Sequence, residues 1–327
     1  MIKLSICIPT YNRAHTLVYL LSSIVREIQS SKLDDYIEVI ISDNASTDNT
    51  RQLVESFSNK IKNINYIRSD QNNGFGINIT NAVSYARGEF CWLMGSDEVL
   101  CDGVLIKLLD IIMVSNSEII LGNAITNGVE RHFYTNPGNF SDISSVSGII
   151  SFIDNCTELS SCFAFISTIV IKKTIFDGEY FPESYISHPY THLIRIFFNL
   201  KFVNCRVELL GWPLVDTGSE VNEWNSIIFN HFKLDYQTAH LVCHSVFSDD
   251  EEIKSSFSEL LKRQYSPLKM IVSRACTTQE QWRDIVTVLQ YFKIPNYLYE
   301  KAIYDPLIRV GYKIIKKTKG ILRNVKY

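Results

Sequence analysis

The chain lacks an apolar run long enough to cross a membrane, which takes about 18 consecutive residues. The longest candidate, Phe163 to Ile171, has the length of a strand and is interrupted by Ser167 and Thr168. No secretory leader is evident either, because Met1-Ile2-Lys3 leads straight into an alternating stretch typical of a strand. We therefore expect a protein that is soluble or peripheral to a membrane.

Metal-binding and disulfide patterns are also missing. The eight cysteines are scattered and form no Cys-x-x-Cys pair. Cys7 and Cys91 lie inside apolar runs, which is typical of a buried free thiol. This usage argues against a zinc or disulfide framework and favours a reducing cytoplasm.

The chain has no excess of basic residues. Its 32 Lys and Arg residues stand against 35 Asp and Glu residues, for a formal net charge of -3. A general nucleic-acid binder needs a basic footprint, so we expect no nucleic-acid partner. With 46% hydrophobic and 12% aromatic residues, the 327-residue chain can bury one large core or two modest ones.

The glycine-rich phosphate loop of dinucleotide-binding enzymes is absent. The G-x-G-x-x-G pattern of that loop should follow the first strand, but Pro9-Thr10-Tyr11-Asn12-Arg13 stands there instead. An NAD-dependent oxidoreductase is therefore disfavoured.

What the first part of the chain does contain is a regular alternation of strands and helices. Apolar stretches predict strands at residues 4–8, 37–41, 64–67, 90–94 and 117–124. Amphipathic segments between them predict helices, the first capped by Asn12 and the third ended by Gly88. This order predicts an α/β fold with a mostly parallel sheet flanked by helices.

The pattern changes twice further along the chain. Residues 126–161 are rich in Asn, Ser, Gly and Pro and read as a long surface connection, followed by strands at 163–172 and 201–210. Beyond about Asn222 every segment has helical spacing. We expect one domain over residues 1–220, with halves of about 1–124 and 125–220, and a smaller helical C-terminal region over 221–327.

Three polar, carboxylate-bearing loops follow three of the predicted strands. They are Ile8–Arg13, Ser42–Asp48 and Gly95–Glu98. In open α/β sheets, ligands bind outside the carboxyl ends of the strands. We therefore expect the three loops to meet at one cleft, which indicates an enzyme.

The same loops carry a family resemblance. Cys7–Arg13, Ile41–Asp48, Asn73-Gly74 and Trp92–Glu98 resemble the signature blocks of family 2 glycosyltransferases, which have the GT-A fold. The resemblance implies transfer of a sugar from a nucleotide-sugar donor.

A narrower similarity, to bacterial O-antigen abequosyltransferases, is carried by Phe163–Lys173, Ser184–Ile186, Tyr190 and His192. It implies CDP-abequose or a related 3,6-dideoxyhexose donor. The implied acceptor is a mannose-containing, undecaprenyl-diphosphate-linked oligosaccharide of lipopolysaccharide biosynthesis. Two alternatives stay open: a family 2 transferase that uses a UDP- or dTDP-hexose for another surface polysaccharide, and a non-catalytic relative that only binds sugar nucleotides.

The resemblance also implies which residues bind the donor. The base would be read by Asp43, which can serve cytosine or uracil because a carboxylate accepts from either. A turn in which Asp43 bonds its own backbone is the alternative. The full set of expected donor-binding residues is Pro9, Thr10, Tyr11, Arg13, Asp43, Asn73, Gly74 and Ser96.

A divalent cation would neutralise the diphosphate leaving group, and carboxylates are the ligands that Mg²⁺ or Mn²⁺ accepts. By resemblance Asp97 is the ligand and Glu98 assists it, while Gly95 stands where the family commonly has a first Asp. The alternative for Asp97 is a cap on the helix that begins near Asp102.

An inverting transfer needs a general base, for which we favour Glu183. Competing candidates are Asp177, Glu179, His188 and His192. Acceptor contacts are expected from Tyr185, Tyr190 and His192. The aromatic residues of this loop also fit an ordinary clamp on the core, and His192 fits a buried helix residue.

The last 22 residues have one sign of charge. After Asp305 there is no acidic residue, and seven basic residues alternate with apolar ones as far as Tyr327. Such a basic amphipathic segment suits an anionic membrane surface. We expect a cytoplasmic protein peripheral to the inner face of the cytoplasmic membrane; a solvated terminal helix is the alternative.

Overall fold

The computed structural model describes residues 1–140, 142–178, 181–218, 228–267, 269–270, 274 and 279–294. Contacts divide the chain into two compact units, Met1–Glu220 and Val221–Tyr327. In the described ranges, no helix combines the length and the apolar character that a membrane crossing requires.

The first half of the sheet is entirely parallel. The strands lie in the order β3-β2-β1-β4, each joined to the next along the chain by a helix. Their bounds are β1 (Leu4–Thr10), α1 (Ala14–Ser31), β2 (Ile37–Asp43), α2 (Thr50–Phe57), β3 (Ile64–Arg68), α3 (Phe75–Ser84) and β4 (Phe90–Leu93).

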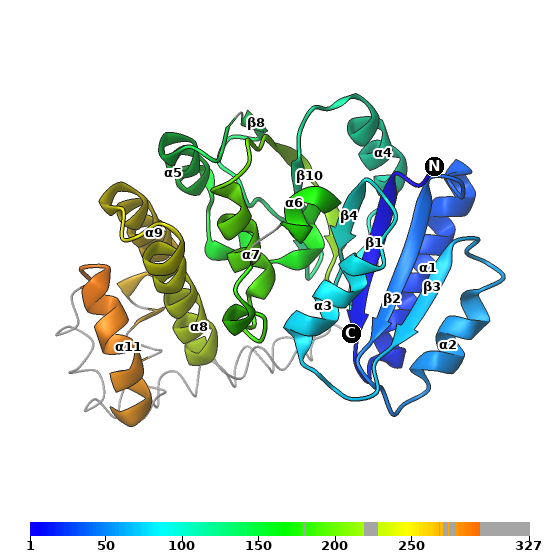
Figure 1. Cartoon of the computed structure of the whole chain (residues 1–327), viewed down its shortest axis with the longest axis horizontal. Helices are drawn as coiled ribbons and strands as arrows, with labels where there is room; N and C mark the ends of the chain where they lie inside the picture. The colour runs from blue at the N-terminus through cyan, green and yellow to red at the C-terminus, as the bar shows by residue number, and fades with distance from the viewer. Residues whose placement is uncertain are drawn as a thin grey trace. The chain divides into compact units, whose positions relative to one another are not determined.

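Helices cover both faces of these strands. Helix α3 packs on β1 and β2, and α1 packs with α2 behind them (Figure 1). Every residue of β1 and β2 is buried, as in a strand covered by helices on both faces. This burial explains why their apolar runs stand out in the sequence.

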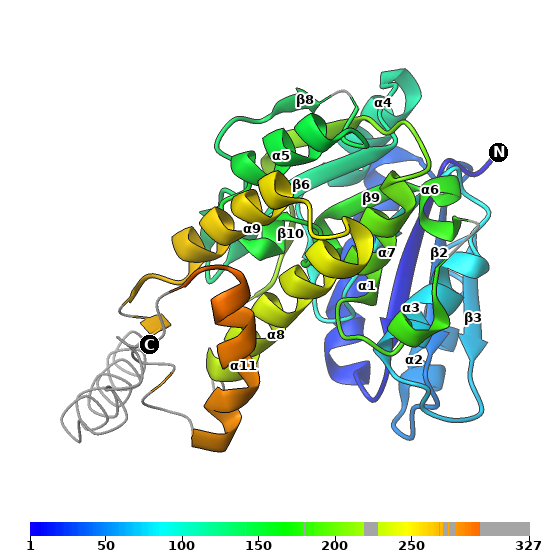
Figure 2. The same ribbon diagram turned by 60° about the vertical axis from the view of Figure 1, so that its left-hand side comes forward.

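The second half of the sheet continues as β9-β6-β10-β5. Figure 2 shows β9, β6 and β10 of this half. The longer strands β6 and β10 are parallel to each other, whereas β9 is antiparallel to both β4 and β6. The strands are β5 (Val99–Leu100), β6 (Ile119–Thr126), β7 (Val129–Arg131), β8 (Gly138–Phe140), β9 (Ile169–Lys172) and β10 (Val207–Asp216). The helices are α4 (Val104–Val114), α5 (Val146–Asn155), α6 (Lys173–Asp177) and α7 (Thr191–Leu200), with short turns η1 (Leu159–Ser161), η2 (Ile166–Thr168) and η3 (Glu183–Tyr185).

Among the described strands of four or more residues, six of seven thus run in one direction, and β9 is the exception. The predicted mostly parallel α/β sheet flanked by helices is confirmed. Because β9 is antiparallel, its first residue lies at the edge where β4 ends, so the chain just before β9 returns to the carboxyl ends of the parallel strands.

The described part of the second unit is helical, as predicted. It contains α8 (Ile228–Leu241), the π-helical segment η5 (Val242–Val246), α9 (Glu251–Gln264) and α11 (Gln279–Tyr291). Its core is aromatic: Phe232 stacks on Trp282 at 5.8 Å between ring centroids and contacts Tyr265 at 5.2 Å. The basic tail after Asp305 lies outside the described residues.

Two predicted helix boundaries are wrong. Asn12 does not cap α1, because its side-chain oxygen accepts the amide of Thr47 at 2.7 Å; the first amide of α1, on Ala14, is bound instead by Asp48. Gly88 does not end α3, which stops at Ser84. A Cβ on Gly88 would lie 2.6 Å from the Ser5 hydroxyl, so this glycine permits a close approach to β1.

Residues 126–161 are not a simple surface connection. They form β7, β8 and α5, which buries Ile149, Phe152 and Ile153. Ser145 caps α5 by accepting the amide of Gly148. This short amphipathic helix was not predicted because the segment is mostly polar and the apolar face of the helix has only three or four residues.

Two later strands are shifted from their predicted positions. The strand expected at 163–172 begins only at Ile169, after the turn η2, and the strand expected at 201–210 runs from Val207 to Asp216.

Candidate active site

The strand order reverses at β1, which makes the carboxyl end of β1 and β4 the natural binding edge. The chain passes from β1 to β2 and β3 on one side and then returns to place β4 on the other side of β1. Ligands of open α/β sheets bind at such a reversal, outside the carboxyl ends of the strands. The three predicted loops follow β1, β2 and β4 and therefore share this edge.

An ion pair joins the loops on the two sides of the reversal. A guanidinium nitrogen of Arg13, just after β1, lies 2.5 Å from a carboxylate oxygen of Asp97, just after β4. The Asp97 side chain is 21% exposed and that of Arg13 is 41% exposed, so both remain accessible from solvent. A cation and an anion thus lie side by side at the expected ligand position.

The alternative that Asp97 caps the following helix is wrong. Helix α4 begins at Val104, and its first amides are taken by Glu27 of α1, which accepts from Gly103 at 3.0 Å and from Leu105 at 3.4 Å. The carboxylate of Asp97 is therefore not needed for helix capping.

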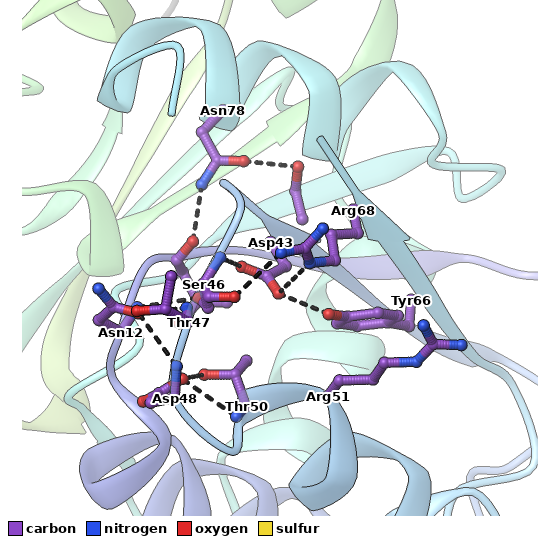
Figure 3. A network of polar contacts seen from close by, with 12 residues as sticks. Asn12, Asp43, Ser46, Thr47, Asp48, Thr50, Arg51, Tyr66, Arg68 and Asn78 are labelled. Carbon is purple, nitrogen blue, oxygen red and sulfur yellow. Dashed lines mark hydrogen bonds and ion pairs between the residues drawn. The ribbon is translucent and has the colours of Figure 1, made fainter. Parts of the chain in front are cut away.

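The loops after β1 and β2 are held together by hydrogen bonds (Figure 3). Asn12, in the left-handed region at φ 51°, accepts from Thr47 and donates its backbone amide to the Ser46 hydroxyl at 2.9 Å. Asp48 accepts from Thr50 at the start of α2 and from Ala14 at the start of α1. The wall of the site is thus built from two strands and two helix starts at once.

Asp43 lies at the centre of this network and is 1% exposed (Figure 3). One carboxylate oxygen accepts the amide of Ser46 at 2.9 Å, which is the hydrogen bond of the turn alternative. The other oxygen accepts the phenol of Tyr66 at 2.5 Å and lies 3.7 Å from the guanidinium of Arg68. Burial and this hydrogen bond to Asp43 raise the pKa of Tyr66, so the phenol keeps its proton and stays a donor.

The turn that contains Asn73 and Gly74 is tied to the same loops. The side-chain amide of Asn44 donates to the carbonyl of Gly74 at 3.2 Å, and its oxygen accepts the amide of Asn73 at 2.9 Å. Gly74 has φ +83°, a conformation that favours glycine. Thr10 is 2% exposed, and its carbonyl accepts from Asn78 of α3.

Other predicted donor-binding residues differ in exposure. Tyr11 is 42% exposed, whereas Pro9 and Ser96 are buried. The side chains of Pro9 and Ser96 therefore contribute to the wall rather than to an open surface.

Glu98 differs from Asp97 in its environment. It is 6% exposed, one carboxylate oxygen accepts the Ser167 hydroxyl at 3.2 Å, and the other has no hydrogen-bond partner among the described residues. Burial, and next the neighbouring Asp97 carboxylate, raise the pKa of Glu98 to about 8. The Asp97 side chain, 21% exposed, is therefore the more accessible carboxylate of the pair, and Glu98 as an assisting ligand stays a prediction.

Within the described part of the chain, no three His, Cys, Asp or Glu side chains are grouped to hold a metal ion. One exposed carboxylate still fits Mg²⁺ or Mn²⁺, because such ions are often held by one or two carboxylates together with substrate phosphates. Asp97 meets this requirement, and the diphosphate would supply the other oxygens.

The predicted acceptor segment lies against the start of α3. A Cβ on Gly76 would lie 1.7 Å from the carbonyl oxygen of Ile186, so only glycine permits this approach. The rings of Phe75 and His192 are in edge contact at 5.9 Å. The segment that contains Glu183 and Tyr185 is thereby brought beside the Gly74 turn.

The two histidine candidates are poorly suited to act as the general base. His192 is 1% exposed, and its Nε2 lies 3.1 Å from the Ala164 carbonyl, to which it must donate. Burial lowers the pKa of His192 to about 4. In His188 the unprotonated Nδ1 already accepts the amide of Tyr190 at 3.0 Å. These contacts match the buried-helix alternative for His192.

The acidic candidates are distinguished by their partners. Asp177 is paired with Lys173, and Glu179 lies outside the described residues. Glu183 is exposed at the start of η3, and no ion pair to it is found in the described ranges. Tyr185 and Tyr190 are half-buried in the same segment.

Sequence reasoning missed three groups of contacts. Tyr66 and Arg68 occupy alternate positions of β3, a spacing that puts both on one face, beside Asp43. Asn44 was read only as part of a motif, and Ser167 only as part of a strand. The alternation in β3 was visible in the sequence, but nothing local marks Ser167 as a neighbour of Glu98.

We expect Glu98→Gln to change the pH dependence of stability. An unfolded glutamate titrates near pH 4.3, whereas Glu98 titrates near 8 in the folded protein. Between these values the folded state holds a proton that the unfolded chain has lost, so stability falls as pH rises. In EDTA-treated protein, Glu98→Gln should therefore lose less stability than wild type from pH 5 to pH 8 and should melt at least about 2 °C higher at pH 8.

The control is Glu89→Gln, the same chemical change at a side chain that is 47% exposed and paired with Lys3. It should leave the pH dependence as in wild type. Melting curves of Glu98→Gln that parallel those of wild type would show that Glu98 is ionised in the folded protein.

The known proteins to which this chain is similar are glycosyltransferases. The profile of glycosyl transferase family 2 matches residues 5–176, just over half of the chain. An abequosyltransferase of Salmonella typhimurium is 28% identical over 86% of this chain and 87% of its own length. The Campylobacter jejuni GalNAc(5)-diNAcBac-PP-undecaprenol beta-1,3-glucosyltransferase is 26% identical over 62% of each chain.

Two solved structures share the fold. Residues 1–349 of Staphylococcus aureus TarS, in complex with UDP-GlcNAc, superpose with a TM-score of 0.65 at 19% identity, covering 91% of this chain and 83% of TarS 1–349. A mannosyltransferase of Pyrobaculum calidifontis, in complex with GDP-Man and Mn²⁺, gives 0.55 at 12% identity, covering 93% and 88%. Because the family profile matches more than half of its residues, the chain belongs to glycosyltransferase family 2.

Proposed function

We propose that this transferase moves a 3,6-dideoxyhexose such as abequose from a CDP-sugar to a mannose-containing, undecaprenyl-diphosphate-linked oligosaccharide of lipopolysaccharide. The observation that carries transfer from a nucleotide sugar is the accessible Arg13–Asp97 pair at the strand reversal. Similarity to the Salmonella abequosyltransferase over most of both chains supports the choice of sugar. The Campylobacter relative, named for an undecaprenol-linked substrate, supports a lipid-linked acceptor.

The donor nucleotide would lie over the carboxyl ends of β1 and β2. Asp43 would face the pyrimidine, held in place by Tyr66 and Ser46. The backbone around Pro9 and Thr10 and the turn at Asn73-Gly74 would form the walls of the base site. Because Asp43 can accept from either pyrimidine, a UDP- or dTDP-sugar remains a competing donor.

The diphosphate would lie at the Arg13–Asp97 pair. Arg13 supplies a fixed positive charge and a planar set of donors suited to phosphate oxygens. Bound Mg²⁺ or Mn²⁺ would neutralise the charge that develops on the leaving diphosphate. Asp97 would hold that ion, and the Mn²⁺ complex of the Pyrobaculum mannosyltransferase supports the use of such an ion in this fold.

Glu183 would serve as the general base of an inverting transfer. The acceptor hydroxyl oxygen forms a bond to the anomeric carbon, and the bond from that carbon to the diphosphate oxygen breaks. The nucleoside diphosphate leaves with the electron pair, and the hydroxyl proton passes to the Glu183 carboxylate. Exposure of Glu183, the occupied Nδ1 of His188 and the burial of His192 support this choice.

The half-buried rings of Tyr185 and Tyr190 would bind the acceptor sugar. They lie in the segment that Gly76 allows to approach α3. Aromatic faces suit the apolar faces of sugar rings. The buried side chain of His192 would pack beneath these rings rather than contact the sugar.

Two substitutions should separate donor binding from proton transfer. In an assay with the best donor from a panel of CDP-, UDP-, dTDP- and GDP-sugars, Glu183→Gln should lower kcat by about 10²-fold or more with little change in donor KM. Asp97→Asn should lower both kcat and Mn²⁺-dependent nucleotide affinity. Steady-state kinetics and calorimetry with the matching nucleoside diphosphate measure the two effects.

Asp177→Asn is the matched control, because it removes an acid from the same region that is already paired with Lys173. A loss of kcat in Asp177→Asn with a normal rate in Glu183→Gln would show that Asp177, and not Glu183, is the general base. Nucleotide binding without transfer to any lipid-linked acceptor would favour the non-catalytic alternative.

We also propose that the basic tail, which lies outside the described residues, binds the inner face of the cytoplasmic membrane. Its seven basic residues are followed and preceded by apolar ones, with no acidic residue after Asp305. A lipid-linked acceptor requires the enzyme to work at that surface.

Deletion of residues 306–327 should abolish sedimentation with vesicles that contain phosphatidylglycerol. The full-length chain should bind these vesicles and not vesicles of phosphatidylcholine alone, because the attraction is electrostatic. A matched variant with the seven Lys and Arg residues changed to Gln should behave like the deletion. Undiminished sedimentation of both variants would remove the tail from membrane binding.

A further inference from the structure

Ser167 contacts both ends of the loop that carries Asp97. Its hydroxyl oxygen accepts the backbone amide of Gly95 at 3.0 Å, and its hydroxyl proton is donated to Glu98 at 3.2 Å. Ser167 is 0% exposed, so neither bond is exchanged readily with water. One hydroxyl therefore fixes the backbone just before Asp97 and the side chain just after it.

Ser167 is itself firmly held. The indole of Trp92, which is 0% exposed, donates to the Ser167 carbonyl at 2.9 Å. Trp92 lies on β4 and is paired with Val170 of the antiparallel strand β9. Ser167 precedes β9 by two residues, so its position follows from the register of the sheet.

A side chain at residue 95 would be crowded by its neighbours. A Cβ on Gly95 would lie 3.1 Å from an Asp97 oxygen, 3.2 Å from the Ser167 hydroxyl and 3.3 Å from Cγ of Glu98. The Ser167 hydroxyl thus fills the space beside Gly95. The hydrogen bonds that hold this loop come from outside it, from the Ser167 hydroxyl.

We propose that Ser167 is a positioning residue, which holds the Gly95–Glu98 loop so that Asp97 stays beside Arg13 and within reach of a donor diphosphate. The effect on the donor rests on the proposed function, whereas the effect on the loop does not. Ser167 acts through Asp97 and needs no contact with substrate.

The test compares Ser167→Ala with Ser161→Ala. Ser161 is also buried, at 1% exposure, and its hydroxyl makes two hydrogen bonds with the backbone of Glu158, away from the loop. Both variants lose one hydroxyl with two bonds, so their effects on overall stability should be similar. Effects seen only in Ser167→Ala then reflect the position of the Gly95–Glu98 loop rather than the stability of the whole protein.

Two readouts are expected to move only in Ser167→Ala. Amide hydrogen exchange in a peptide that spans residues 93–98 should be faster by roughly tenfold than in wild type and Ser161→Ala. The Mn²⁺ concentration needed for half-maximal binding of CDP or UDP, measured by calorimetry, should rise by roughly three- to tenfold. Ser167→Thr, which keeps the hydroxyl, should restore exchange toward the wild-type rate.

A double-substitution cycle tests the shared space. Gly95→Ala should impair Mn²⁺-dependent nucleotide binding in wild type and impair it less in the Ser167→Ala background, because one of the three crowding atoms is gone. Additive effects would contradict the assigned contact.

Wild-type exchange rates in Ser167→Ala would overturn the proposal, and so would faster exchange with an unchanged Mn²⁺ requirement. If the wild-type protein binds none of the nucleotides, the proposed function fails. In that case the exchange comparison between Ser167→Ala and Ser161→Ala still decides whether Ser167 holds the loop.

Discussion

The ion pair between Arg13 and Asp97 is the contact on which the account depends, because it spans the point where the strand order reverses. A partly exposed pair of this kind contributes at most about 1 kcal/mol to stability, so its importance is positional rather than energetic. It keeps a cation and an anion adjacent at the carboxyl ends of β1 and β4. Those are the two charges that a diphosphate and its counter-ion need, and both can exchange partners when a ligand enters.

The loops that carry the pair are held by hydrogen bonds on both sides. On one side, Asn12 and Asp48 bond the loops after β1 and β2 to each other. On the other side, Ser167 bonds both ends of the loop after β4. Each brace comes from a segment distant in sequence, so the site forms only when the sheet is complete. Residues that hydrogen-bond the loops around a site in this way keep its binding groups within a narrow range of positions.

Much of this arrangement could be predicted from sequence, and the misses have physical reasons. Strands buried on both faces leave long apolar runs, which is why the ends at Asp43 and Asp97 were found. The contact of Ser167 with Gly95 was not predictable, because it joins residues 72 apart through an antiparallel strand in a mostly parallel sheet. Gly88 was wrongly predicted for the same reason: it does not end a helix but permits the chain before β4 to approach β1 closely. Close approach depends on tertiary packing and leaves no periodic signal.

Asp97 and Glu98 are adjacent in the chain but differ in burial, and this difference separates their properties. The sequence gives two neighbouring carboxylates, but burial of Glu98 raises its pKa to about 8, whereas the Asp97 side chain stays 21% exposed. Asp97 is therefore the carboxylate that a metal ion can reach from solvent. The most direct test of the account is a crystal structure of the protein with Mn²⁺ and the nucleoside diphosphate that binds best. The account predicts an anomalous manganese peak at the Asp97 carboxylate and a base beside Asp43, and a nucleotide or manganese ion bound at any other edge of the sheet would contradict it.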